Sequence, residues 1–384
     1  MKYYIIAGEA SGDLHGSNLI REIKMRDPDA VIRGWGGNLM KEAGAEIVKD
    51  YRDLAFMGFT EVIRNLPTIL RNIKFCKSDI LFFKPDAIIF IDYPGFNLRI
   101  AEWSRKMGFK TIYYISPQVW AWKESRVKGI RDNIDKMLVI LPFEKDFFQK
   151  WNYETEYVGH PLVEVIERFK HSPQANLPPE IYLSGDEKFK PVLPMIALLP
   201  GSRKQEILMK LPVMLEASKQ LPAFQFVVAE APGQDSGFYD EVLKNYPKAG
   251  RVRNQTYSLL MHASAACVTS GTATLETALF GVPEVICYKG SSISYQIAKR
   301  LIKVKYISLV NLIMDRPVVR ELIQDEMNVK NIVSELKKLV SDNETKERLR
   351  REYAELRNLL SQGGNASQKA AESIVQFVKN RPVP

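Results

Sequence analysis

The chain has 384 residues, of which 46% are hydrophobic and 26% are charged, and its net charge is +9. This length is too great for one ordinary core and fits two domains, and the composition excludes a disordered chain. No run of about 18 apolar residues predicts a membrane-spanning helix. The positive charge predicts an anionic partner, which would be a nucleic acid, a phosphorylated substrate or an anionic membrane surface.

Short apolar strands alternate with amphipathic helices along the chain. The first strand is expected at 2–7 and the first helix at 14–26. Further strands are expected at 30–35, 87–91, 111–115 and 136–140, and then at 195–199, 224–229, 265–269 and 284–288. Because these strands are apolar throughout, they predict parallel sheets covered on both faces.

The pattern stops at 171–190, "HSPQANLPPEIYLSGDEKFK", and then restarts. We therefore predict an α/β protein with two facing Rossmann-like domains at 1–170 and 191–345, joined by 171–190 as a linker. Residues 346–384 are predicted to form C-terminal helices that pack back toward the N-terminal domain. Ligands of open parallel sheets bind beyond the carboxyl ends of the strands, so two facing sheets predict one cleft.

Cysteine and histidine usage bounds the chemistry of the site. The three cysteines show no CxxC spacing and the four histidines no ligand spacing. We therefore expect reduced thiols, a cytosolic protein and no metal site. The chain begins directly with an apolar strand, so no targeting segment is expected.

The turn after the first strand, "AGEASGDLHG" at 7–16, opens a helix. A helix N-terminus favours an anion or a sugar hydroxyl, but the spacing is not GxGxxG, and Glu9 and Asp13 would repel a pyrophosphate. The alternative is a tight turn in which Ser11 or Asp13 caps the helix.

Two turns in the second half predict anion sites. In "LLPGSRKQEI" at 198–207, a Gly-Ser-Arg turn places Ser202 and Arg203 at a helix N-terminus, where backbone amides and a guanidinium suit a phosphate. The alternative is that Arg203 caps the helix or pairs with Glu206.

The second of these turns lies in "TSGTATLETALFGVP" at 269–283. Ser270, Gly271 and Thr272 can wrap a phosphate with amides and hydroxyls, and Glu276 can accept hydrogen bonds from a ribose diol. The alternative is a plain helix start with a solvated Glu276.

In "AIIFIDYPGFN" at 87–97, a buried strand ends on Asp92. A carboxylate that faces a cleft at the end of a rigid strand can act as a general base. Asp92 could equally cap the turn into the next helix at 97–106. A second acid, Asp86, precedes the same strand.

These pieces together resemble the lipid-A-disaccharide synthase family, glycosyltransferases of the GT-B type with two Rossmann-like domains. The resemblance covers nearly the whole chain. It rests on these stretches in the family's order: Ala7–Asp13, Phe90–Asn97, Tyr114–Ile130, Leu141–Phe148, Tyr157–Pro161, Leu199–Arg203, Ser270–Glu276 and Tyr306–Ile313. The resemblance implies an inverting transfer that joins UDP-2,3-diacylglucosamine to 2,3-diacylglucosamine 1-phosphate (lipid X), forming a β-1,6-linked disaccharide and UDP.

The resemblance also implies roles for the candidate residues. The second domain would hold UDP through Ser202, Arg203, the Ser270–Thr272 turn and Glu276, and Asn311 would reach the cleft from a matching stretch. The first domain would hold the acceptor, with Asp92 as the base and Asp86 and Glu9 as alternatives. No Asp-x-Asp element follows a strand, so no metal and no cofactor are expected.

The lipid substrates imply a membrane surface. In "FTEVIRNLPTILRNIKFCKSDILFF" at 59–83, the apolar residues recur at helical spacing among basic residues. We expect an interfacial helix on the cytoplasmic face of the inner membrane, extended by Met209. The predicted membrane contacts are Val62, Ile63, Leu66, Ile69 and Leu70. The alternative is a helix that packs this stripe on the sheet. The sequence leaves a homodimer open.

Other functions remain as alternatives. A UDP-N-acetylglucosamine 2-epimerase or a peptidoglycan glycosyltransferase would share the second domain's motifs, whereas the Asp92 strand and the Trp120/Trp122 segment favour the lipid A enzyme. A nucleotide-binding dehydrogenase would need the missing GxGxxG. No basic run interleaved with aromatic residues predicts a nucleic-acid partner.

Overall fold

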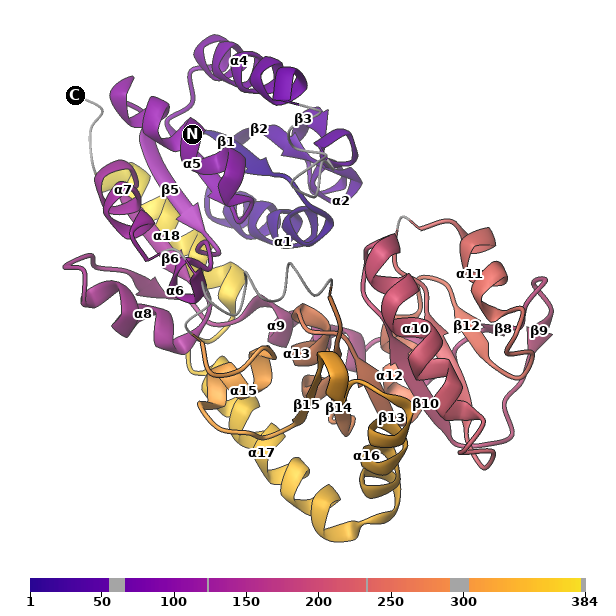
Figure 1. Cartoon of the computed structure of the whole chain (residues 1–384). Coiled ribbons are helices and arrows are strands. Elements are labelled where there is room, and N and C mark those ends of the chain that lie inside the picture. Colours follow the sequence, from indigo (N-terminus) through magenta and orange to yellow (C-terminus); the bar gives the residue numbers. More distant parts are fainter. Residues whose placement is uncertain (55–65, 123, 233, 291–303, 381–384) are drawn as a thin grey trace. The chain divides into compact units, whose positions relative to one another are not determined.

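The computed structural model describes residues 1–54, 66–122, 124–232, 234–290 and 304–380 (Figure 1). The chain divides into two compact units, one formed by Met1–Pro161 with Leu360–Pro384 and the other by Leu162–Leu359. These divisions lie close to, but not at, the boundaries expected at 170 and 345. No helix in the described ranges is both long and apolar enough to cross a bilayer.

The first unit contains a seven-stranded sheet, as far as its residues are described, in the order β3-β2-β1-β4-β5-β6-β7. All its strand pairs are parallel. Its strands are β1 (Lys2–Ala7), β2 (Val31–Gly36), β3 (Glu46–Asp50), β4 (Ala87–Ile91), β5 (Lys110–Tyr114), β6 (Lys136–Val139) and β7 (Glu156–Tyr157). The strand order reverses between β1 and β4, and ligands of such sheets bind at the reversal point.

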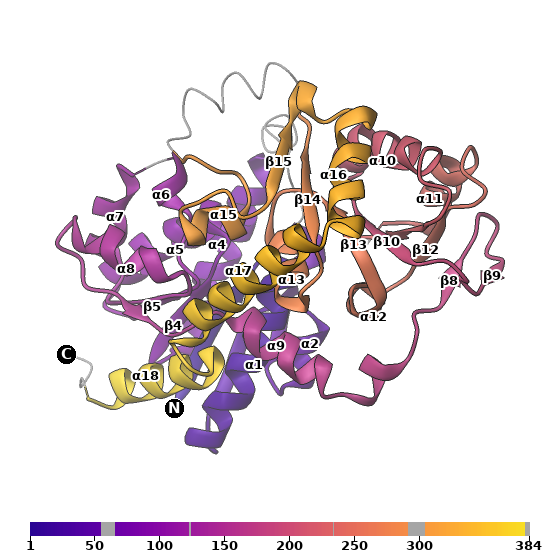
Figure 2. The ribbon, with the colours of Figure 1, turned by 90° about the horizontal axis from the view of Figure 1, so that it is seen from below.

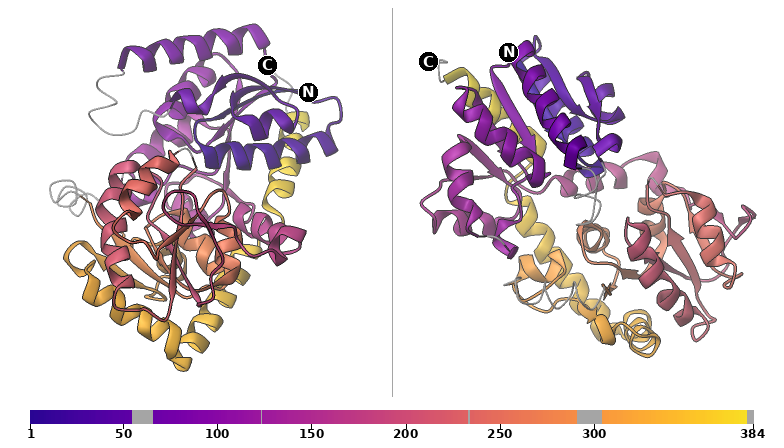
Figure 3. Two further views of the ribbon diagram at one scale, coloured as in Figure 1. Left: turned by 90° about the vertical axis from the view of Figure 1, so that its right-hand side faces the viewer. Right: turned by 45° about the horizontal axis from the view of Figure 1, so that its top comes forward.

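Helices cover both faces of the first sheet. On one face, Leu19 and Ile23 of α1 and Ile374 of α18 share a core with the strands, and on the other face Ile80 of α4 and Ile100 of α5 do so. Figure 1 and the left view of Figure 3 show α1 and α4 on opposite sides of the strands. The helical elements are α1 (Ala10–Arg26), α2 (Asn38–Glu42), η1 (Tyr51–Leu54), α4 (Leu66–Phe83), α5 (Pro94–Lys106), α6 (Val119–Trp122), α7 (Arg126–Asn133), α8 (Pro142–Gln149) and α18 (Ala366–Asn380).

The chain's last helix, α18, belongs to the first unit as predicted, whereas the preceding helix, α17 (Asn343–Ser361), belongs to the second unit up to Leu359. Helix α18 lies beside α1 (Figure 2), and the Arg26 guanidinium donates to the Glu372 carboxylate at 2.8 Å. The predicted parallel α/β fold is therefore confirmed for this unit, including the return of the chain end.

The second unit contains an eight-stranded sheet within its described residues, in the order β15-β14-β13-β10-β11-β12-β8-β9. Its strands are β8 (Ile181–Tyr182), β9 (Lys188–Phe189), β10 (Met195–Leu199), β11 (Gln225–Ala229), β12 (Gly250–Val252), β13 (Ala263–Val268), β14 (Glu284–Tyr288) and β15 (Arg320–Ile323). The pairs from β15 to β12 are parallel, and β8 joins β12 in the antiparallel direction.

Helices also accompany the second sheet. They are α9 (Pro161–Lys170), η2 (Pro173–Asn176), α10 (Lys204–Ser218), α11 (Ser236–Leu243), α12 (Thr256–His262), α13 (Thr272–Phe280), α15 (Leu309–Met314), η3 (Gln324–Glu326), α16 (Val329–Ser341) and α17 (Asn343–Ser361). The right view of Figure 3 shows α10 and α11 beside the strands of this unit.

The sequence predicts a linker at 171–190. In the structure this stretch is part of the second unit. It forms η2 and the β8–β9 hairpin, which extends the sheet beyond β12. Asp186 in the hairpin loop accepts a hydrogen bond of 2.5 Å from Arg251, a fully buried residue of β12. A buried guanidinium needs a carboxylate partner, so this ion pair fixes the hairpin to the sheet.

Candidate active site

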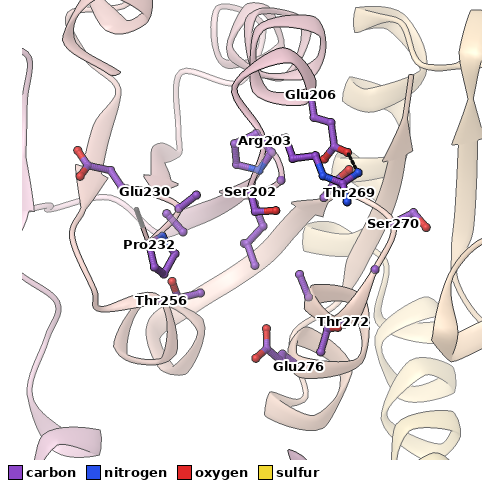
Figure 4. A pocket seen from close by; sticks show the side chains of 17 residues that line it. Ser202, Arg203, Glu206, Glu230, Pro232, Thr256, Thr269, Ser270, Thr272 and Glu276 are labelled. Carbon is purple, nitrogen blue, oxygen red and sulfur yellow. Dashed lines mark hydrogen bonds and ion pairs between the residues drawn. The ribbon is translucent and has the colours of Figure 1, made fainter. Parts of the chain in front are cut away.

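A cavity of about 450 Å³ opens at the carboxyl ends of β10, β11 and β13 (Figure 4). Among the predicted nucleotide residues, Ser202, Arg203, Ser270, Gly271, Thr272 and Glu276 line it together. Glu206, predicted only as a partner of Arg203, also lines the cavity, and the sequence analysis assigns no role to three further lining residues, Glu230, Thr256 and Thr269. Glu230 and Thr269 directly follow β11 and β13, so the rule that ligands bind after strand ends could have found them.

The Arg203 turn supplies one wall of this cavity. Gly201 has a φ of +114°, a conformation that favours glycine, and Arg203 is the N-cap of α10. The exposed Arg203 guanidinium donates to the Glu206 carboxylate at 3.1 Å, as Figure 4 shows. The structure thus contains the predicted alternative, the pair with Glu206, at a helix N-terminus that also suits an anion.

The Ser270 turn supplies the opposite wall. Gly271 has a φ of +133°, and α13 begins at the next residue, so the amides of its first turn lie beside the cavity. The Ser270 hydroxyl donates to the Ile307 carbonyl at 2.7 Å, which fixes the turn. Two helix N-termini at one cavity make it suited to a phosphorylated ligand.

Glu276 lies on α13 at the edge of the cavity. Its carboxylate accepts a hydrogen bond of 2.9 Å from the Tyr257 hydroxyl. Burial raises the pKa of Glu276, and the Tyr257 bond opposes that rise. Tyr257 carries no signal in the sequence, because only the fold brings α12 next to α13.

A buried lysine lies behind the cavity. Lys210 of α10 is 2% exposed, and its ammonium donates to the hydroxyl of Thr269, a residue that lines the cavity. Burial lowers the pKa of Lys210, and the neighbouring Glu206 carboxylate partly opposes this shift. The cavity therefore has positive charge beneath its wall as well as at its mouth.

Asn311, predicted to reach the cleft, does not line this cavity. Its amide donates to the Val319 carbonyl at 2.9 Å and to Glu321 at 3.0 Å, and its oxygen accepts from the Val319 amide at 3.0 Å. The buried side chain is thus used to join α15 to the approach of β15. Met209 also lies outside the lining of the cavity, with its side chain partly exposed on α10.

In the first unit, Asp92 follows β4 in an unusual backbone conformation. Asp92 and Tyr93 have φ values of 43° and 50°, in the left-handed region that non-glycine residues rarely adopt. The Asp92 carbonyl accepts hydrogen bonds from Asn97 at 2.8 Å and from the Tyr113 hydroxyl at 2.5 Å, which hold this turn. Such conformations cost about 1–3 kcal/mol each and occur often at functional sites.

The cap of the helix after β4 is Tyr93, not Asp92, so the alternative role of Asp92 as a helix cap is not what the structure contains. Burial, and then the negative charges of Glu9 and Glu144, raise the pKa of Asp92 to about 7. A carboxyl with such a pKa exchanges a proton near neutral pH, which a general base must do.

Glu9 lies next to Asp92 because β1 and β4 are neighbours, with Ala7 opposite Ile91 in the register. Between them the backbone of Gly8 packs against the Tyr93 ring, since an added Cβ would lie 2.3 Å from it. The first turn and the Asp92 turn therefore form one surface.

Asp13, the other acid of the first turn, is a structural residue. Its carboxylate accepts hydrogen bonds from the amides of Gly37 at 2.8 Å and Met40 at 3.0 Å. It therefore caps α2, and not its own helix as the alternative for this turn supposed.

Asp86 lies at the amino ends of the strands, opposite to the end at which Asp92 lies. It precedes β4 and accepts a hydrogen bond of 2.7 Å from the Lys2 amide. The strand of five residues between it and Asp92 spans about 16 Å at roughly 3.3 Å per residue. Asp86 is therefore not an alternative to Asp92.

Glu144 is a second acid near Asp92 that sequence reasoning missed. This buried carboxylate accepts hydrogen bonds from the Ser116 hydroxyl, the Trp120 indole at 3.1 Å and the Leu141 amide at 2.9 Å. It thereby attaches the Ser116–Trp120 segment to the end of β6. No group of three metal-ligating side chains occurs among the described residues.

Comparisons with known proteins cover nearly the whole chain. The family model described as lipid-A-disaccharide synthetase matches residues 3–378. A lipid-A-disaccharide synthase of Syntrophus aciditrophicus is 38% identical over 98% of this chain and 97% of its own length. The Koribacter versatilis enzyme of that name is 34% identical over 99% and 100%.

Solved structures share the fold at low identity. A UDP-GlcNAc 2-epimerase of Neisseria meningitidis, bound to UDP-GlcNAc, has a TM-score of 0.67 and 12% identity over 98% of this chain and 100% of its own. The glycosyltransferase of kitacinnamycin has a TM-score of 0.64 and 14% identity over 98% and 99%. These likenesses confirm the predicted GT-B fold, and the family match confirms a glycosyltransferase of lipid A biosynthesis rather than an epimerase or a dehydrogenase. The chain belongs to the lipid-A-disaccharide synthase family.

Proposed function

We propose that the protein joins UDP-2,3-diacylglucosamine to 2,3-diacylglucosamine 1-phosphate (lipid X) through a β-1,6 linkage, with inversion, and releases UDP. The observation that carries the proposal is the cavity in which the Arg203 turn, the Ser270–Thr272 turn and Glu276 meet. Two helix N-termini, a guanidinium and a carboxylate at one cavity match the diphosphate and ribose of a nucleoside diphosphate.

The second unit would hold UDP in a defined direction. The diphosphate would lie against Arg203, Ser202 and the amides of Gly271 and Thr272. The ribose diol would donate to Glu276, whose carboxylate Tyr257 orients. As the glycosidic bond to UDP breaks, negative charge grows on the diphosphate, and these donors would stabilise it.

Asp92 would act as the base for the acceptor. In an inverting transfer the acceptor hydroxyl attacks the anomeric carbon opposite the leaving UDP, and its proton must be removed. The pKa of Asp92, raised to about 7, is consistent with a group that takes this proton near neutral pH. Glu9 is the neighbouring carboxylate that supports this pKa by its charge, while Asp86 and Asn311 have no role in the proposal.

The test is an assay for UDP release with purified substrates. We expect release from UDP-2,3-diacylglucosamine only when lipid X is present. Conversion of UDP-N-acetylglucosamine without an acceptor would instead favour an epimerase. Release of UDP with a peptidoglycan precursor but not with lipid X would favour the other transferase.

We also propose that α4 contacts an anionic membrane surface, because both substrates carry acyl chains. Cys76 and Ile80 of α4 are buried against the sheet, as the alternative for this segment supposes. Other apolar side chains of the helix remain exposed, including Leu70 at 58% and Phe82 at 78%. Among the residues predicted for this contact, Val62 and Ile63 lie outside the described residues, and Leu66 begins α4.

Basic residues of α4 support the proposed contact between this helix and an anionic membrane surface. Arg71 and Lys74 lie on the same helix as Leu70, and Phe75 is also exposed at 43%. Apolar insertion together with basic residues near an anionic surface, at about 1 kcal/mol each, suffices for peripheral binding. The expected location is the cytoplasmic face of the inner membrane. Met209 is a further candidate contact.

A further inference from the structure

Glu206 occupies the position in the Arg203 turn where an anion would bind. It lies in the first turn of α10, and its carboxylate folds back over the turn, because a Cβ added to Gly201 would lie 2.8 Å from Glu206 Oε2. One oxygen accepts from Arg203 Nη1 at 3.1 Å. An acidic group thus already fills the positive end of the helix that faces the cavity.

Lys210 holds the other oxygen of this carboxylate. Its ammonium lies 3.7 Å from Glu206 Oε2 and donates to the hydroxyl of Thr269, which follows β13 and lines the same cavity. The Lys210 side chain is buried, whereas the Arg203 side chain is exposed. A buried ammonium needs its counterion more than an exposed guanidinium does, because water screens only the latter.

A diphosphate and the Glu206 carboxylate compete for the same donors. Both are anions, both suit Arg203, and both are favoured at the N-terminus of α10. When a diphosphate enters, Arg203 can turn to it while Glu206 remains with Lys210. The carboxylate is then close to the phosphates and repels them.

We propose that Glu206 is a displaceable internal anion, which neutralises Arg203 in the empty cavity, yields it to the diphosphate of the sugar nucleotide, and weakens the hold on UDP so that the product leaves. The inference rests on the proposed function, namely that a UDP-sugar binds in this cavity. In this proposal Glu206 sets the affinity for the diphosphate, and Lys210 keeps the Glu206 carboxylate in place. The competing role, in which Glu206 orients Arg203 toward the ligand, predicts the opposite effect on affinity.

The experiment measures UDP and uridine affinity by calorimetry for the wild type and for Glu206→Gln. We expect UDP to bind about fivefold more tightly to the variant, the size of one like-charge repulsion at close range in a hydrated site. Uridine, which has no phosphate, should bind equally to both. In an activity assay the variant should be inhibited by UDP at correspondingly lower concentrations.

The matched control is Glu216→Gln on the same helix. Glu216 pairs with Lys219 at 2.7 Å and does not line the cavity. It should bind UDP as the wild type does. Glu206→Ala removes the same charge without leaving an amide beside Lys210, and serves if the Gln variant does not fold. Weaker or unchanged UDP binding in a folded variant, or equal tightening of uridine, would overturn the inference. Failure of the wild type to bind UDP at all would instead overturn the proposed function.

Discussion

Tyr257 donates a 2.9 Å hydrogen bond to Glu276 across the α12–α13 packing, at the edge of the cavity. The carboxylate is thereby oriented beside the cavity that it lines. A ribose diol that donates to this carboxylate would bind to a preformed acceptor.

The hydrogen bond between Tyr257 and Glu276 predicts how the ribose of the nucleotide is bound. Tyr257→Phe should weaken UDP binding by about threefold to tenfold, because the buried carboxylate loses its donor. Glu276→Ala should weaken it at least as much. If the diol is the ligand, the cost of Glu276→Ala should be smaller for 2′-deoxy-UDP than for UDP. Calorimetry with both nucleotides measures this, and equal losses would remove Glu276 from the ribose site.

The role of Asp92 as the base is tested by the same substitution at the two ends of β4, at Asp92 and at Asp86. Asp92→Asn keeps the shape of the side chain and removes its basicity, so turnover should fall by about 10²–10⁴-fold while UDP affinity stays near normal. Asp86→Asn is the matched control, since it makes the same change at the opposite edge of the sheet, and it should retain near-normal turnover. Near-normal turnover of Asp92→Asn would assign Asp92 to a structural role.

The pH dependence follows from the pKa of Asp92, which burial and the charges of Glu9 and Glu144 raise to about 7. A base acts when deprotonated, so kcat/KM should rise as the pH increases through about 7 and level off above it. Glu9→Gln removes a charge that raises this pKa, so the rise should move to lower pH. A pH–rate profile of both proteins measures the shift. An unshifted profile in the Glu9 variant would separate Glu9 from the base.

The sequence was most informative where function depends on local pattern. Strands such as β1, β4 and β10 appear at their predicted residues because continuous apolar runs mark buried parallel strands. The sequence predicts anion sites at the Arg203 and Ser270 turns because small residues at a strand–helix junction leave the amides of the helix N-terminus open to a ligand. The short strands β8 and β12 were missed, because two or three residues carry no periodicity.

Residues that act through distant partners could not be predicted. Glu144 and Tyr257 are ordinary residues on amphipathic helices until the fold supplies their partners. For Asn311, a stretch that resembles the family predicts a ligand contact, and the structure adds bonds of its amide with the Val319 backbone and the Glu321 carboxylate that no sequence pattern indicates. Asp86 could have been excluded from the sequence, because it precedes its strand and so lies at the edge away from the ligand.

Stability should depend on pH through Glu284, a buried residue of β14. Among the described residues neither of its carboxylate oxygens has a hydrogen-bond partner, and burial raises its pKa well above the usual value. The folded state therefore holds this proton more tightly than the unfolded state does. The wild type should lose stability relative to Glu284→Gln as the pH rises above about 4.5, the ordinary range of a glutamate. Urea unfolding of both proteins at pH 5 and pH 8 measures the difference, and a difference that does not grow with pH would contradict the assignment.

Membrane contact is tested on the exposed face of α4. Leu70, Phe75 and Leu81 are exposed in the structure, so changing all three to serine should leave the fold intact, as circular dichroism would show. If this face inserts into the interface, sedimentation with anionic vesicles should fall by about tenfold or more, since each buried apolar side chain contributes about 1.5–3 kcal/mol when fully inserted.

The control for the α4 variant changes Met25 and Met107 to serine. These residues are 66% and 50% exposed at the ends of other helices of the same unit. That variant should sediment as the wild type does, and neutral vesicles should bind both proteins weakly because the basic residues of α4 then lack a partner. Equal sedimentation of the α4 variant and the wild type would place the membrane contact elsewhere on the protein.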